Sequence, residues 1–130
     1  MAVVGAGVLA AASQSISAQP AANASGGADP ARVCRAAIAA LMGRDPAIIK
    51  VVRSAGGVVD TRYVRPTDGT VWKNRCRISG NRVEWAAYQG GALGRWRSED
   101  VITYSVSGGR IRVVGSSYGE QMFNEIYTVR

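Results

Sequence analysis

Arginine is the residue type through which this sequence could do chemistry. The chain has 130 residues, with 16 Lys and Arg against 9 Asp and Glu, so the net charge is +7. Lys50 and Lys73 are the only lysines, which leaves 14 arginines. A guanidinium group binds phosphate or carboxylate through two parallel hydrogen bonds. The charge therefore indicates anionic partners, although a G- and C-rich genome, whose codons favour Arg, Ala, Gly and Val, would give the same bias.

Catalytic constellations are missing from the sequence. Histidine is absent, which removes the commonest general base and metal ligand and any Ser-His or Cys-His pair. Two cysteines cannot supply the four ligands of a zinc site. A hydrolase built on distant carboxylates such as Asp60, Glu84 and Glu125 stays open. We predict a non-enzymatic protein without a cofactor or metal.

The elements that must position the arginines begin with a helix. Asp29-Pro30 is a helix start and Gly43 a helix stop, so residues 30–42 are predicted to form an amphipathic helix. The apolar period then changes to two, which is typical of strands. The segment 48–54 is the first expected strand, although Asp45-Pro46 could open a second short helix. The predicted fold is α+β, one N-terminal amphipathic helix packed on an antiparallel meander sheet of five to seven strands.

Two turns set the register of the central strands. A two-residue turn at Gly80-Asn81 places Cys76 opposite Trp85 and Ile78 opposite Val83, and a four-residue turn at 66–69 places Tyr63 opposite Trp72. The predicted core face then carries Val59, Tyr63, Trp72, Cys76, Ile78, Val83 and Trp85. The helix should cover this face and bring Cys34 to Cys76. Such a pair forms a disulfide in an exported protein and two free thiols in a cytoplasmic one.

The opposite sheet face is the first candidate binding surface. Its predicted binding residues are Arg62, Lys73, Arg75, Arg77, Arg82 and Tyr88. Together they would form a basic surface with an aromatic rim that could hold an anionic polymer. The alternative is a solvated face, because Asp60 is expected opposite Arg75 and Glu84 opposite Arg77.

A long Gly-rich loop at 89–100 carries the second candidate. Trp96 lies between Arg95 and Arg97, and such a tryptophan could stack on a base or sugar ring while the arginines hold phosphate or carboxylate. The alternative is that Trp96 closes the edge of the core and its neighbours reach outward to solvent.

The N-terminal segment is typical of export. Residues 2–12 are apolar, uncharged and too few to span a bilayer, which predicts a signal peptide at 1–18 with cleavage after Ala18 or Ala24. No Lys or Arg precedes the apolar run, so an Ala-rich tail or a misassigned start stays open. Residues 19–28 have linker composition, and 29–130 form a single predicted domain. We expect no transmembrane span in the mature chain.

The order of several features resembles that of small exported proteins of unassigned function in Gram-negative bacteria. The features are Cys34, the turn at 65–69, Trp72, Cys76-Arg77 and the loop 95–97. This resemblance implies export and a disulfide but no activity. We therefore expect a periplasmic or secreted domain that binds an anionic envelope component or an acidic protein. The alternatives are a cytoplasmic nucleic-acid-binding module, and an inhibitor of an envelope enzyme that works through the loop at 89–97.

Overall fold

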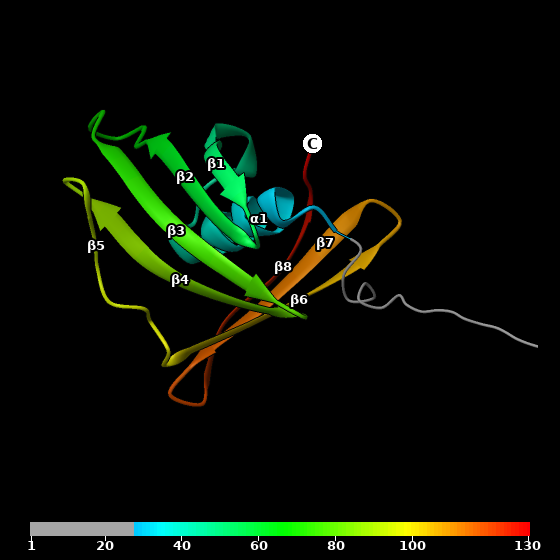
Figure 1. Cartoon of the computed structure of the whole chain (residues 1–130). Helices are drawn as coiled ribbons and strands as arrows, with labels where there is room; N and C mark the ends of the chain where they lie inside the picture. The colour runs from blue at the N-terminus through cyan, green and yellow to red at the C-terminus, as the bar shows by residue number, and fades with distance from the viewer. Residues whose placement is uncertain (1–27) are drawn as a thin grey trace, which may run out of the picture.

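The computed structural model describes residues 28–130 (Figure 1). The predicted signal peptide, its cleavage sites and almost all of the linker lie outside the described residues. Helix α1 spans Pro30–Met42. The Asp29 side chain accepts a hydrogen bond from the Ala31 amide at its start, and Gly43 ends it in the left-handed conformation with φ 65°.

The segment after the helix was expected to form a strand at 48–54 or a short helix opened by Asp45-Pro46, and it contains both a short helix and a strand. A short 3-10 helix, η3 (Pro46–Ile48), is capped by Asp45, and strand β1 (Lys50–Ala55) follows. The strand predicted to begin at 48 therefore begins two residues later, because proline and its aspartate cap favour a helical turn there.

Seven further strands complete an antiparallel sheet. They are β2 (Val58–Val64), β3 (Val71–Ser79), β4 (Arg82–Gln89), β5 (Ala92–Leu93), β6 (Asp100–Ser107), β7 (Arg110–Ser117) and β8 (Glu120–Thr128). The order is β1-β2-β3-β4-β6-β7-β8, with β5 paired to β4 alone. The predicted α+β meander with one packed helix is confirmed, but the strand number is eight rather than five to seven. The additional strand is β5, a two-residue ladder inside the segment expected to be a loop.

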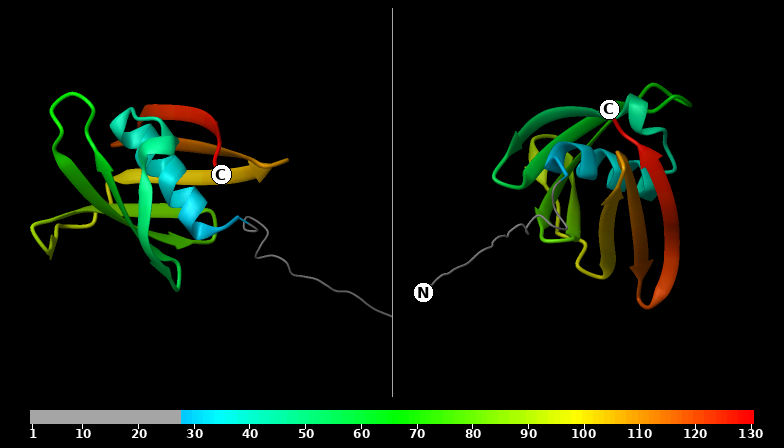
Figure 2. Two further views of the ribbon diagram at one scale, coloured as in Figure 1. Left: turned by 90° about the horizontal axis from the view of Figure 1, so that it is seen from above. Right: turned by 90° about the vertical axis from the view of Figure 1, so that its right-hand side faces the viewer.

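The sheet curves around α1, which lies on its concave side (Figures 1 and 2). The helix contacts β1, β2 and β3 at one end of the sheet and β7 and β8 at the other. The two parts join where β4 pairs with β6 through only two residue pairs. Among the described residues, no helix is long and apolar enough to cross a membrane.

The predicted register and disulfide are confirmed. Cys76 pairs with Trp85, Ile78 with Val83, and Tyr63 with Trp72. Within the predicted core face, Trp72 and Ile78 are half-buried and the other members are buried. Cys34 and Cys76 form a disulfide with 5.9 Å between their α-carbons, which fixes α1 to the centre of the sheet.

Arg35 fixes α1 to two other segments. Its Nε donates to the Ile49 carbonyl at 2.9 Å, and Nη2 donates to the Pro46 carbonyl at 2.9 Å. Its Nη1 donates to the carbonyl of Arg130 at the C-terminal end. One guanidinium thus joins the helix, the start of β1 and the end of the chain, and it satisfies three backbone acceptors.

Candidate functional site

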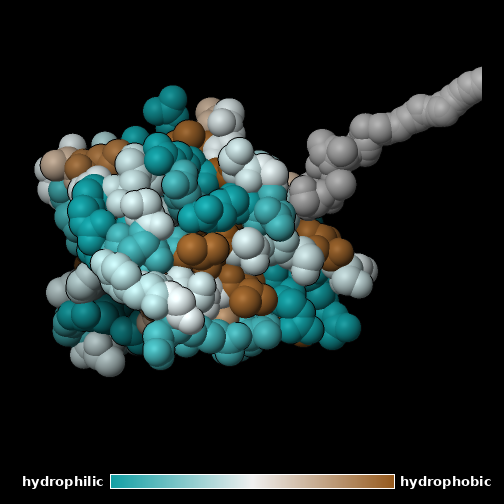
Figure 3. Space-filling model, turned by 90° about the horizontal axis from the view of Figure 1, so that it is seen from below, coloured by the Kyte–Doolittle hydropathy of each residue, from teal (hydrophilic) through white to brown (hydrophobic). Residues whose placement is uncertain are grey.

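The convex side of the sheet, away from α1, is the outer face, and it carries most of the predicted binding residues. The observed pairing places Arg62 opposite Lys73, Arg75 opposite Asp60, and Arg77 opposite Glu84. Figure 3 shows one side of the molecule, where hydrophilic side chains surround small, separate groups of apolar ones. Because paired residues lie side by side on neighbouring strands, the side chains of the outer face form successive rows that run across the strands.

Two of these rows are internally paired. Arg75 donates to both carboxylate oxygens of Asp60, at 2.6 and 2.9 Å, and these hydrogen bonds raise the pKa of Arg75. Arg77 donates to Glu84 at 2.7 Å. Both pairs were predicted and are confirmed. Arg75 and Arg77 are therefore already engaged within the protein, and their charge is offset for an incoming anion.

A third row differs because its cations have no acidic partner. Lys50 of β1 lies opposite Arg62 of β2, which lies opposite Lys73 of β3. We call these three residues the cationic row. Within residues 28–130, no ion pair includes any of them. Like charges directly opposite each other destabilise a sheet, so this row raises the free energy of the free protein.

Both lysines of the chain belong to the cationic row. The sequence analysis identified Arg62 and Lys73 but missed Lys50. Its position depends on the pairing of β1 with β2, which shifts register between Val51 and Arg53. Lys50 Nζ donates to the Ala47 carbonyl at 3.2 Å, a neutral partner that leaves its charge uncompensated. The signal available from sequence was the start of a β-branched run, but it did not fix which residue faces Arg62.

A shallow hollow lies beside the cationic row. Its volume is about 160 Å³, and its lining residues are Val52, Asp60, Thr61, Arg62, Lys73 and Tyr88. Asp60 is the only acid in this lining, and both of its oxygens accept from Arg75. The Tyr88 ring has the Arg75 guanidinium over it at 4.8 Å. The hollow thus combines two cations with an aromatic and an aliphatic surface.

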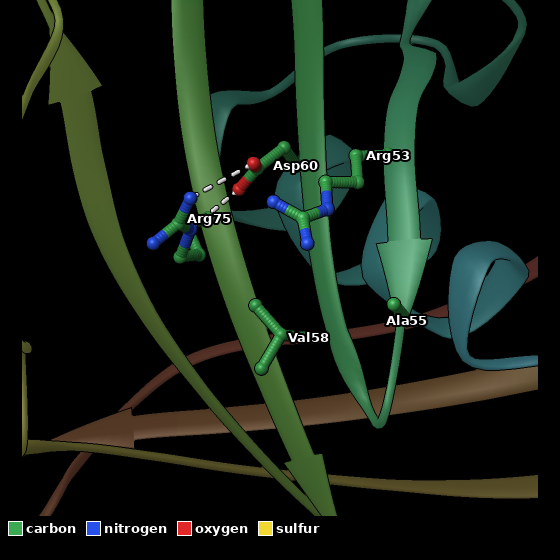
Figure 4. Close-up of a pocket in the computed structure, with 5 residues that line it drawn as sticks. All are labelled: Arg53, Ala55, Val58, Asp60 and Arg75. Atoms are coloured by element: carbon green, nitrogen blue, oxygen red, sulfur yellow. Dashed lines mark hydrogen bonds and ion pairs between the residues drawn. The ribbon is translucent and has the colours of Figure 1, made fainter.

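A second hollow of about 260 Å³ adjoins the first at Asp60. It is lined by Arg53, Ala55, Val58, Asp60 and Arg75. Figure 4 shows the Arg53 side chain reaching from β1 toward Asp60, on the side away from Arg75. Two guanidiniums therefore flank one carboxylate, and this row contributes a net charge of only +1. Arg53 is a further outer-face cation that the sequence analysis did not include.

Arg82 does not join the cationic row. It is half-buried at the start of β4, opposite Ser79 and Thr103, and its Nε is buried without a hydrogen-bond partner. Tyr88 lies six residues further along the same strand, about 20 Å away. Arg82 and the hollow at Tyr88 therefore cannot hold the same small group.

The predicted loop residues are also occupied by contacts within the protein. Arg95 donates to both oxygens of Glu99 at 2.9 Å, and this lowers the pKa of Glu99 to about 2. Trp96 is half-buried, with the Arg77 guanidinium 4.0 Å from its ring centre. Arg97 lies 5.1 Å over the Trp85 ring. One face of Trp96 is thus stacked internally, and the loop extends over the outer face.

Comparison with known proteins identifies no relative. The chain matches no protein-family model, no curated protein and no solved structure. The resemblance to small exported bacterial proteins stays a prediction.

Proposed function

We propose that this protein is an exported, non-enzymatic domain that binds an anionic envelope component through the cationic row. The observation that carries the proposal is the alignment of Lys50, Arg62 and Lys73 without an acid. Their repulsion opposes folding in the free protein. A bound anion would remove that repulsion, so the row is better suited to a bound state than to a free one.

The dimensions of the row favour a polymer over a single ion. Neighbouring strands lie about 4.8 Å apart, so the outer members of the row are about 10 Å apart. That span allows successive charged groups of one chain to meet successive cations. Tyr88 pairs with Leu93 of β5 beyond Lys73, and its ring, with the Arg75 guanidinium over one face, lies beside the cations. Charged sugars fit this combination, because their rings pack on aromatic side chains while guanidinium and ammonium groups hold their anions.

Export is supported by the disulfide. The bond between Cys34 and Cys76 is consistent with a location outside the cytoplasm, where such bonds persist. Periplasmic or secreted localisation is part of the proposal, and the apolar segment at 2–12 supports it as a sequence pattern. The row is therefore expected to meet anionic polysaccharide or lipid headgroups, or an acidic envelope protein, rather than nucleic acid.

The test is retention on immobilised lipopolysaccharide in a rising salt gradient. Arg62→Gln/Lys73→Gln lowers the net charge by two and should elute at clearly lower salt than the parent protein. The control, Arg32→Gln/Arg130→Gln, makes the same change in net charge at two exposed arginines outside the row. The proposal requires the control to elute close to the parent protein. Equal elution of both variants would show that net charge, not the row, sets retention.

A further inference from the structure

The outer face carries a second basic group at the other end of the sheet. Arg110 and Arg112 are two residues apart on β7, so both point to the same side. Ser107 lies opposite Arg110 on β6, and Ser105 lies opposite Arg112. Each arginine is thus paired across the ladder with a hydroxyl rather than a carboxylate.

These four side chains enclose a hollow. Its volume is about 170 Å³, and Ile126 of β8 completes the lining. Arg112 Nη1 donates to the Asn124 side-chain oxygen at 2.7 Å, which orients the guanidinium. Within residues 28–130, no ion pair includes Arg110 or Arg112, and no acid lines the hollow. The arginines therefore keep their charge and most of their donors.

The arrangement suits a small tetrahedral anion. Paired residues on neighbouring strands have β-carbons about 5 Å apart, and alternate residues along one strand lie about 7 Å apart. The β-carbons of the four residues therefore outline an area of about 5 by 7 Å, and the two guanidiniums and two hydroxyls extend from its corners. All four can donate hydrogen bonds to oxygen, and a phosphate group presents oxygens in several directions at once.

We propose that Ser105, Ser107, Arg110 and Arg112 form a phosphate-binding site. The ligand is a phosphate group, either free or as a monoester on a larger molecule. The site is separate from the cationic row, which lies on β1, β2 and β3. It also differs in chemistry, because hydroxyl donors stand where the row has further cations.

The test uses the full chain with its disulfide intact. Inorganic phosphate is titrated against chloride at constant ionic strength, and backbone amide shifts are followed by NMR. Saturable shifts are expected on β6 and β7 around the four residues. Ser105→Ala/Ser107→Ala leaves the net charge unchanged and should weaken binding about ten-fold, because two hydrogen bonds to the anion are lost at solvent-exposed positions. Ser105→Thr/Ser107→Thr keeps both hydroxyls and should retain most of the affinity.

A second probe distinguishes a free phosphate from one on a membrane. Phosphatidylcholine vesicles containing phosphatidic acid present the same monoester on a surface. Binding that depends on the two serine hydroxyls supports the site. The probe that binds shows whether the phosphate group is free or carried on a lipid. The proposal is overturned if Ser105→Ala/Ser107→Ala binds both probes as tightly as the parent protein, or if the parent protein binds neither probe saturably.

The cationic-row variant separates this proposal from the proposed function. Arg62→Gln/Lys73→Gln leaves all four residues of the phosphate site in place. It should bind inorganic phosphate as the parent protein does while its retention on lipopolysaccharide falls. A parallel loss of phosphate binding would contradict a separate site.

Discussion

Replacing Arg62 by glutamine should stabilise the fold, because Arg62 is the middle member of the cationic row. It lies directly opposite Lys50 on one side and Lys73 on the other. For an assumed separation of about 7 Å between charged groups in water, each neighbour raises the energy by about 0.6 kcal/mol. Removing the repulsion from both neighbours should raise the free energy of unfolding by about 1.2 kcal/mol at low salt. The lost packing of the half-buried Arg62 side chain reduces this gain by a few tenths of a kcal/mol.

The salt dependence identifies the cause. At physiological ionic strength the Debye length of about 8 Å reduces the repulsion to about 0.5 kcal/mol, and at 1 M salt it nearly vanishes. The free energy of unfolding should be measured in urea, which adds no ions, at several chloride concentrations. Arg62→Gln should gain about 0.5–1 kcal/mol at low salt and lose a few tenths of a kcal/mol at 1 M, where only the packing loss remains.

Arg75→Gln is the matched control for this measurement. It removes the same charge from the neighbouring row but breaks both hydrogen bonds to Asp60. It should destabilise the protein by about 1 kcal/mol, the reverse sign. Destabilisation by Arg62→Gln at low salt, or an effect equal at all salt concentrations, would refute the repulsion within the row.

Three further predictions concern the fold. Cys34→Ala/Cys76→Ala should lower the free energy of unfolding, measured in urea, by about 4 kcal/mol, because the disulfide closes a loop of about 40 residues. A loss below about 1 kcal/mol would contradict this expectation. Gly115→Ala should lower the free energy of unfolding by about 1–3 kcal/mol, because a β-carbon there would lie 2.4 Å from the Phe123 ring. Thermal and urea unfolding measure this loss, and an unchanged midpoint would show that the ring moves freely. The Glu99 carboxyl should titrate in NMR with a pKa of about 2, because Arg95 donates hydrogen bonds to its charged form. The pair with Arg95 then stabilises the fold fully above pH 4.5, and that contribution is lost as the pH falls toward 2. An ordinary pKa for Glu99 would show that the pair is absent in solution.

Short-range signals explain why so much of the sheet could be predicted. Asp29-Pro30 and Gly43 define the helix through local hydrogen bonds that need no tertiary partner. The two-residue turn at Gly80-Asn81 fixes the pairing of β3 with β4, because side chains alternate with a period of two. The position of Cys76 on the core face followed from that register, and so did the disulfide.

The site was harder to predict because it depends on contacts that no local pattern encodes. Lys50 joins the cationic row only because β1 shifts register beside Val51, and an extra residue in one strand is invisible to a count of alternation. Trp96 lies under Arg77 because a ten-residue connection folds back over the sheet. The serines opposite Arg110 and Arg112 are unremarkable in sequence, and their role emerges only from pairing across β6 and β7.

Lysine reactivity reports directly on where the anion binds, because the chain has only two lysines and both belong to the cationic row. The protein should be acetylated with a limiting amount of reagent, free and bound to lipopolysaccharide, and the modification at Lys50 and Lys73 measured by mass spectrometry. The α-amino group provides an internal reference for reagent access. If the cationic row holds the anion, binding should slow acetylation of both lysines relative to this reference. Unchanged rates at Lys50 and Lys73 in fully bound protein would show that the anion binds elsewhere.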